Sequence, residues 1–382
     1  MLCFSVRKKH EKVCVGAIIA HMQTPLAMTP LCQFHRSQGA HMDLFAGYLM
    51  PIYYRGIIEE HRWTREHVSL FDTAHMRMIR VQAPIVVIQH CFTNDIVSLK
   101  IGRCRYGFFV NAAGETIDDA IAYRIADDQI MFVINAGHAD VDMSHVRDSI
   151  GLHWQVELIE KYVKTDIQGP RSRDVLRAVF GPGIDALKYF GFALFRYDEH
   201  EVIVSRTGYT GELGFEIYIP QQSLESLWKT LLADERVRPA GLGARDSLRL
   251  EMGYALFGHE IGDGYSVFEA GLGTYFKDDL DCVGRAALLF QRDRVASKLV
   301  YFLCEGRRVA RAGYTVRQHG KDIGKVCSGA YSPGLERAIG NAMVDASAFD
   351  AAAPFSLITE RGAEIAAAVS TVPFISNTSL MS

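Results

Sequence analysis

Residues 115–123 read Glu115-Thr116-Ile117-Asp118-Asp119-Ala120-Ile121-Ala122-Tyr123, an alternation typical of a β-strand. Because successive strand side chains point to opposite faces, Asp118 and Asp119 lie on different faces. One face carries Ile117, Asp119, Ile121, Tyr123 and Ile125, and the other carries Asp118, Ala120, Ala122 and Arg124. Asp119 is therefore expected among isoleucines and a tyrosine, where desolvation raises a carboxyl pKa and prepares an acid or base. The alternative is a carboxylate that caps backbone N–H groups where the strand begins.

Strand and helix patterns alternate on both sides of this segment. Further strands are predicted at 77–81, 106–111, 129–135, 155–168, 201–206 and 214–219, and helices at 57–69, 138–149, 171–180, 222–233 and 243–253. The pattern over 31–50 is also helix-like, with Gly and Pro interruptions around 45–47 and 50–51. Past about residue 285, short strand-like segments separated by Gly, Pro, Asp or Ser predict a small barrel or sandwich. The fold class is therefore α+β in the first three quarters of the chain and all-β at its end.

Composition excludes several classes of protein. The chain has 382 residues, 49% of them hydrophobic, which is enough for two or three packed domains. Its formal net charge is −3 with the basic residues scattered, so the bulk charge gives no reason to expect a nucleic-acid partner. No two cysteines form a CxxC pair, and no HExxH or HxH motif occurs, so no metal site is expected.

Residues 1–28 are expected to be a disordered extension, or an upstream start that precedes Met28. Basic residues 7–9 precede an apolar stretch, 13–20, that is too short to span a bilayer. A signal peptide is the alternative, but Lys12 lies at the edge of that stretch and no clear cleavage site follows. An ordered chain is expected from Thr29-Pro30-Leu31. No transmembrane helix is expected elsewhere.

A second informative segment covers residues 205–219, with glycines at 208, 211 and 214. Such spacing permits a tight connection of positive φ between two strands. In the strand that follows, Phe215, Ile217 and Ile219 form an apolar face, and Glu216 and Tyr218 lie on the other. Glu216 is either a solvated glutamate or an acceptor for a paired N–H/NH₂ edge, such as that of a pterin ring.

A third segment, residues 239–251, has a Gly-rich start to a predicted helix, which could bind an anion. Arg245 within it either contacts a ligand or carboxylate, or forms a local ion pair with Asp246 or Glu251. Covalent thiol catalysis by Cys91 is not expected, because its one neighbouring histidine, His90, points away along the chain.

Taken together, these segments resemble the aminomethyltransferase family, the T-proteins of the glycine cleavage system, from about Thr29 to Phe374. The ordered matches are Thr29-Pro30-Leu31 with His35, Phe45-Ala46-Gly47-Tyr48 with Met50-Pro51, Leu70-Phe71-Asp72 with His75-Met76, Thr93-Asn94-Asp95, Ile117-Asp118-Asp119, Asn135-Ala136, Gln168-Gly169-Pro170, Ser205–Ile217, Gly241–Glu251, Gly258-His259-Glu260, Glu269–Gly273, and Ser328-Gly329 with Ser332-Pro333. Any one block alone is weak, but so many in order make the resemblance specific.

The resemblance implies a three-domain, ring-like fold around a central channel that holds tetrahydrofolate. Two interleaved α+β folate-binding domains would cover 29–284, approximately as 29–55 with 140–284, and 56–139. A C-terminal β-barrel domain would cover 285–382.

The resemblance also assigns site residues. Asp119 takes the position of the catalytic carboxylate, and Glu216 that of the residue pairing with the pterin edge. The other positions implied to bind the cofactor tetrahydrofolate are Tyr106, Tyr123 and Tyr209 in the channel wall, Asn135, and Arg245.

The implied reaction moves the methylene carbon from aminomethyl-dihydrolipoyl H-protein to tetrahydrofolate, with release of ammonia. Lipoylated H-protein is the implied partner, with no nucleic acid and no membrane. The implied location is the cytoplasm, or the mitochondrial matrix for a eukaryotic source.

Four positions depart from the family pattern. Thr274, followed by Tyr275, stands where a tryptophan is usual, and Val267-Phe268 where a proline is common. Gly114-Glu115 replaces Gly-Gly, and Ala74 replaces serine. Thr274 leaves open a folate-dependent demethylase of a small methylated donor. The third alternative is a non-catalytic folate-binding protein, and the retention of Asp119 argues against it.

Overall fold

The computed structural model describes residues 26–262 and 264–382. The extension expected over residues 1–28 therefore lies mostly outside the described residues. Residues 26–28 are described, and Ala27–Met28 form strand β1, which pairs in parallel with β3 (Tyr48–Tyr53). The expected disorder is thus wrong for these two positions.

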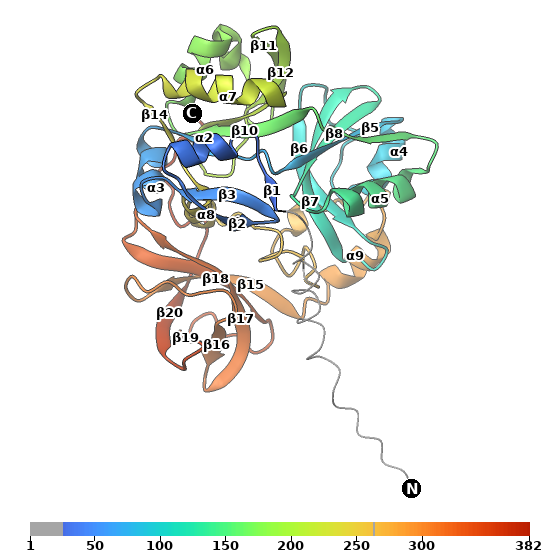
Figure 1. Ribbon diagram of the computed structural model, residues 1–382. Coiled ribbons are helices and arrows are strands. Elements are labelled where there is room, and N and C mark those ends of the chain that lie inside the picture. Colours follow the sequence, from blue (N-terminus) through green and yellow to red (C-terminus); the bar gives the residue numbers. More distant parts are fainter. Residues whose placement is uncertain (1–25, 263) are drawn as a thin grey trace.

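The first body is built on a six-stranded sheet of order β11-β12-β13-β10-β4-β14 (Figure 1). Its strands are β4 (Val68–Asp72), β10 (Tyr162–Gln168), β11 (Phe192–Tyr197), β12 (His200–Ser205), β13 (Gly214–Pro220) and β14 (Val237–Pro239). The helices of this part of the chain are α2 (Cys32–Ser37), α3 (Ile57–Glu66), α6 (Ser172–Phe180), α7 (Leu224–Leu232) and α8 (Leu242–Glu251). The apolar face of β13, with Phe215, Ile217 and Ile219, belongs to the core of this body, as its alternation predicts.

The second body is a five-stranded sheet of order β6-β7-β8-β5-β9, on the right of Figure 1. Its strands are β5 (Arg77–Gln82), β6 (Cys104–Val110), β7 (Thr116–Ala126), β8 (Gln129–Ile134) and β9 (Gln155–Leu158). The helices α4 (Ile85–Ile88) and α5 (Ala139–Ile150) contribute to its core. Ala120 and Ala122 of β7 lie in that core, so the face of β7 that carries Asp118 turns toward it.

The third body is a closed six-stranded barrel of order β15-β18-β17-β16-β19-β20, at the bottom of Figure 1. Its strands are β15 (Ser297–Cys304), β16 (Thr315–Gln318), β17 (Lys321–Ser332), β18 (Arg337–Asp345), β19 (Phe355–Ile358) and β20 (Glu364–Ser370). The helix α9 (Arg285–Arg292) precedes it. The predicted fold class is therefore confirmed: an α+β region is followed by a β-barrel.

Strand pairing moves two of the expected domain boundaries. β4 pairs with β10 and β14, so the boundary expected near residue 56 falls too early along the chain. β9 pairs with β5, so the boundary expected near residue 140 also falls too early. The chain leaves the six-stranded sheet between β4 and β5, and returns to it between β9 and β10.

The helix-like pattern over residues 31–50 is an incomplete prediction. Only α2 is helical, and β2 (His41–Phe45) then forms a hairpin with β3. Ala46 and Gly47 make its two-residue turn, with φ values of 47° and 82°, which is the left-handed geometry that such tight hairpins need. Together with β1 these strands form a small sheet of order β1-β3-β2.

Contacts between the first two sheets position the candidate site. One apolar cluster joins Tyr123 of β7, Tyr218 of β13 and Phe192 of β11. The ring centroids of Tyr123 and Tyr218 are 5.5 Å apart. The face of β7 that carries Asp119 and Tyr123 therefore turns toward the six-stranded sheet.

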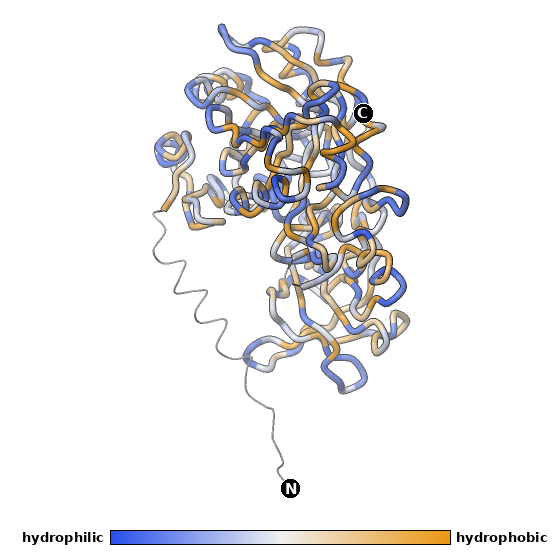
Figure 2. Tube along the Cα trace, turned by 90° about the vertical axis from the view of Figure 1, so that its right-hand side faces the viewer, coloured by the Kyte–Doolittle hydropathy of each residue, from blue (hydrophilic) through white to orange (hydrophobic). Residues whose placement is uncertain are grey.

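None of the described helices is both long enough and apolar enough to cross a membrane. In Figure 2, apolar and polar stretches alternate along the trace.

Candidate active site

Asp119 accepts one hydrogen bond on each of its carboxylate oxygens. The Tyr106 hydroxyl donates to Oδ2 over 2.9 Å, and the Asn135 side-chain amide donates to Oδ1 over 2.7 Å. Tyr106 is on β6, Asp119 on β7, and Asn135 directly follows β8. Since these three strands are hydrogen-bonded neighbours, the sheet brings together three residues that the sequence prediction named separately.

The environment of Asp119 raises its pKa to about 7. Burial is the largest cause, and the negative charge of Asp118 adds to it. The hydrogen bonds from Tyr106 and Asn135 act in the opposite direction, because they stabilise the charged form. A carboxyl group of this kind exchanges a proton readily at neutral pH.

Asp118, on the other face of β7, is fully buried. Its Oδ1 accepts from the backbone N–H of Asp119 over 2.9 Å and from the side-chain amide of Asn135 over 2.8 Å. Its Oδ2 accepts from the backbone N–H of Asn135 over 3.1 Å. The alternative for Asp119 was a carboxylate that caps backbone N–H groups. In the structure Asp118 has this role.

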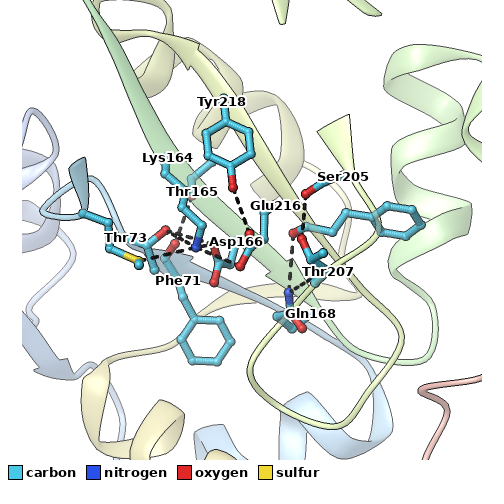
Figure 3. Close-up of polar contacts among 12 residues, drawn as sticks. Phe71, Thr73, Lys164, Thr165, Asp166, Gln168, Ser205, Thr207, Glu216 and Tyr218 are labelled. Atoms are coloured by element: carbon cyan, nitrogen blue, oxygen red, sulfur yellow. Dashed lines mark hydrogen bonds and ion pairs between the residues drawn. The ribbon is translucent and has the colours of Figure 1, made fainter. Parts of the chain in front are cut away.

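A second polar cluster lies in the six-stranded sheet, centred on Lys164 of β10 (Figure 3). Its Nζ lies 2.6 Å from Asp166 Oδ1 and 2.9 Å from Glu216 Oε1. The hydroxyls of Tyr218 and Tyr123 donate to Glu216 Oε2 over 3.0 and 3.3 Å. Glu216 is only 4% exposed, so the alternative of a solvated glutamate is wrong.

Sequence reasoning missed Lys164 and Asp166. Their spacing of two within a strand was the available signal, because it puts both side chains on one face. The sequence does not give the register between β10 and β13, in which Asp166 lies opposite Glu216 and Lys164 opposite Tyr218. Two carboxylates opposite each other in a buried sheet require a cation between them, and Lys164 supplies it.

Arg245 extends this cluster toward Tyr209. Its Nη1 lies 2.8 Å from Asp166 Oδ2, and its guanidinium carbon lies 4.8 Å from the centroid of the Tyr209 ring. The expected local ion pair of Arg245 with Asp246 or Glu251 is wrong, since Arg249 takes the Asp246 partner.

The two clusters are linked electrostatically through tyrosines. Burial raises the pKa of the Tyr106 hydroxyl well above its usual value, and the charge of Asp119 raises it further. Burial also raises the pKa of Tyr209, where Glu260 and Asp119 add to the effect. Asp119 therefore acts on a tyrosine that packs against Arg245 of the second cluster.

Tyr275 is a further aromatic residue of the site that the sequence prediction did not assign. Its ring lies edge-on to that of Tyr106, with 4.9 Å between centroids. The neighbouring Thr274, where the family usually has tryptophan, is exposed. An aromatic ring thus lies against Tyr106 even though residue 274 does not supply one.

The Gly-rich start of α8 does not present a free anion site. The backbone N–H of Gly241 donates to Glu60 Oε2 over 2.8 Å, so a carboxylate of the chain itself occupies this helix end. A Cβ atom on Gly241 would lie 2.3 Å from the backbone of Ile52. The glycine is therefore required for close packing.

Cys91 is buried, and burial raises the pKa of its thiol well above the usual value. A buried thiol of raised pKa is a poor nucleophile, in line with the expectation that catalysis does not use it.

Comparisons with known proteins agree over nearly the whole described chain. The GCVT N-terminal domain matches residues 31–279, and the glycine cleavage T-protein C-terminal barrel domain matches residues 298–375. An aminomethyltransferase of Halothermothrix orenii is 38% identical over 357 residues, covering 91% of this chain and 99% of the relative. One of Thermotoga neapolitana is 38% identical over 324 residues, covering 83% of this chain and 89% of the relative.

A solved structure gives the same result. The crystal structure of glycine cleavage system aminomethyltransferase T from Bartonella henselae superposes with a TM-score of 0.87 at 32% sequence identity. The match covers 92% of this chain and 99% of that one. The chain therefore belongs to the glycine cleavage T-protein family and is an aminomethyltransferase of the glycine cleavage system.

Proposed function

We propose that this enzyme transfers the methylene carbon of an aminomethyl group, carried on the dihydrolipoyl arm of H-protein, to tetrahydrofolate, with release of ammonia. The observation that carries the proposal is the Asp119 carboxyl group, held by Tyr106 and Asn135 with a pKa of about 7. It supports a reaction in which protons are moved without a protein nucleophile.

Tetrahydrofolate supplies the nucleophilic N5 and the neighbouring N10, which together receive the carbon as its bonds to the amino nitrogen and to the dihydrolipoyl sulfur break. The two protons lost from the folate nitrogens end on the released ammonia and on the dihydrolipoyl thiol. Ionised Asp119 accepts a proton on its carboxylate when a folate N–H is lost. Its negative charge also stabilises the positive charge that develops on the one-carbon unit. Tyr106 and Asn135 hold the two carboxylate oxygens in place, so that no reorganisation is needed during the reaction.

Glu216 suits a donor edge of the pterin ring. An ionised carboxylate has about four acceptor positions. Lys164, Tyr218 and Tyr123 use three of them, the last in a long contact of 3.3 Å. One N–H of a ligand therefore fits directly, and a second requires the Tyr123 hydroxyl to turn to Ser205, whose Oγ is 3.0 Å away.

Lys164 and Arg245 balance the charges of Asp166 and Glu216. Glu216 can therefore remain ionised in a buried site, where an unpaired carboxylate would be protonated. The Tyr209 ring packs against Arg245 and stacks with Tyr254, which fixes its position beside this cluster. We assign tetrahydrofolate binding to these residues.

The test is single-turnover formation of methylenetetrahydrofolate from aminomethylated H-protein, comparing wild type with Asp119→Asn. Rapid turnover that collapses in the variant, with tetrahydrofolate affinity retained, supports the proposal. Tight folate binding by wild type without turnover would overturn it, and would point to a small methylated donor instead.

A further inference from the structure

Asp118 meets another buried carboxylate behind the candidate active site. Asp142, in the first turn of α5, is fully buried, as is Asp118. A carboxylate oxygen of each lies within 4.8 Å of the other. Neither oxygen of Asp142 accepts a hydrogen bond from an N–H or hydroxyl group of the described residues.

The charges around this pair do not allow both groups to be ionised. Asp118 of β7 faces Asp142, and Asp119, on the other face of the strand, adds to the negative charge. A ring nitrogen of His138, at the start of α5, lies within 4.8 Å of a carboxylate oxygen of both Asp118 and Asp142. Within the described part of the chain, no lysine or arginine forms an ion pair with Asp142. Two adjacent buried carboxylates that neither lysine nor arginine neutralises share one proton, since the second charge costs too much in a medium of low polarity.

Hydrogen bonding decides which group carries the proton. Asp118 accepts three N–H donors, from Asp119 and twice from Asn135, and these stabilise its charged form. The helix N-terminus of α5 would favour a charged Asp142, but no described N–H group reaches its carboxylate. The proton therefore belongs on Asp142.

We propose that Asp142 is a positioning residue, a neutral carboxylic acid that donates its O–H to Asp118 and so fixes the Asp118–Asn135–Asp119 chain of hydrogen bonds. Asn135 is the link, because its one amide nitrogen donates to both carboxylates. This inference rests on the proposed role of Asp119, since Asp142 itself does not contact a reacting group.

The pKa shifts agree with this arrangement. Burial, together with the charge of Asp118, raises the pKa of Asp142 to about 9. Asp142 is thus neutral over the range in which Asp119, with a pKa of about 7, gains and loses its proton. Its negative charge would appear only at alkaline pH, where it would oppose ionisation of the groups beside it.

The direct test is infrared spectroscopy in an Asp119→Asn background, which removes the carboxyl group of Asp119, itself partly protonated near pH 7. We expect the C=O stretch of a protonated carboxyl group at neutral pH, lost on adding Asp142→Asn and retained on adding Asp140→Asn. Asp140 is the matched control, because it is exposed in the same helical turn. Absence of the band from the Asp119→Asn protein would overturn the proposal. So would a tightly bound divalent cation that disappears with Asp142→Asn.

Kinetics separate positioning from mere support of the fold. Asp142→Asn keeps a neutral N–H donor, so kcat is expected to stay within about twofold of wild type. Asp142→Leu removes the donor, so kcat should fall on the order of tenfold, with KM for tetrahydrofolate changed less than about twofold. Equal losses in both variants would contradict the proposal. Full activity of Asp119→Asn would instead contradict the proposed function, while leaving the infrared result intact.

Discussion

Lys164 and Glu216 form a buried ion pair, with 2.9 Å between Nζ and Oε1 and side chains no more than 5% exposed. The pair crosses from β10 to β13 on the face of the sheet that looks toward β7. It ties the residue proposed to bind the pterin edge to a cation that already neutralises Asp166. Glu216 is therefore oriented before any ligand arrives, which lowers the entropy cost of binding.

Replacing Lys164 with methionine should destabilise the protein and weaken folate binding together. Asp166 keeps Arg245, but Glu216 keeps only the two tyrosine hydroxyls. Removal of one partner of a buried pair costs roughly 3–5 kcal/mol. Urea unfolding measures the loss, and Lys161→Met, at an exposed position three residues earlier, is the control. A free energy of unfolding equal in both variants would show that the pair contributes nothing.

The pH dependence of single-turnover transfer should report the ionisation of Asp119. Because the ionised form accepts the proton, the rate is expected to rise as pH increases through about 7. The Asp119→Asn variant should lose this dependence along with most of its activity. A wild-type rate that falls with rising pH over the same range would contradict the assigned role.

Whereas the transfer rate should rise with pH, the contribution of Asp119 to stability should fall. Its folded-state pKa is raised from 3.8 to about 7, so the native protein binds more protons than the unfolded chain between these values. Stability attributable to this group therefore falls as pH increases from about 4 to about 7. Asp119→Asn should raise Tm above pH 7 and have a diminishing effect toward pH 4. Thermal unfolding across this range checks it, and a Tm difference independent of pH would be evidence against the shift.

The faces of the central strands could be predicted from sequence, but their partners could not. The alternation of side chains along a strand is a local pattern. It correctly puts Asp119 and Tyr123 on one face of β7, and Glu216 and Phe215 on different faces of β13. The ion pair of Lys164 with Glu216 depends on the register between β10 and β13, which no local pattern fixes. Arg245 shows the same limit: its nearby candidates are Asp246 and Glu251, whereas its partner Asp166 is 79 residues away.

Short buried strands were the main omission in the fold. The helix predicted over 57–69 takes in the first two residues of β4, and the other three are predicted as neither helix nor strand, because five buried residues show no alternation. In the structure β4 lies between β10 and β14. The β2–β3 hairpin is not predicted from the sequence for another reason. Its turn is made by Ala46 and Gly47, and alanine is an unusual residue at a positive φ.

Exchanging Asn135 for aspartate should shift the pH profile of transfer toward higher pH. The amide nitrogen of Asn135 donates to Asp118 Oδ1 and Asp119 Oδ1, and a carboxylate there would face both acceptors without a donor. The loss of the donor and the added negative charge both raise the pKa of Asp119, so a higher pH is needed to ionise it. An unchanged profile with lower amplitude would mean that Asn135 only supports the fold.

Gly241, directly before α8, and Gly243, within it, provide a test of packing with a matched control. A Cβ on Gly241 would lie 2.3 Å from the backbone of Ile52, which cannot move aside, whereas a Cβ on Gly243 would first meet the flexible end of Ile57 at 2.6 Å. Gly241→Ala should therefore cost at least about 3 kcal/mol, the upper end for overpacking, and Gly243→Ala should cost clearly less.

Since Gly241 also donates to Glu60, displacement of this helix end would move Arg245, which lies one turn further along α8. Tetrahydrofolate affinity should consequently fall in Gly241→Ala and remain near wild type in Gly243→Ala. Equal stability and equal affinity of the two variants would mean that the close approach of α8 to β3 does not position the arginine.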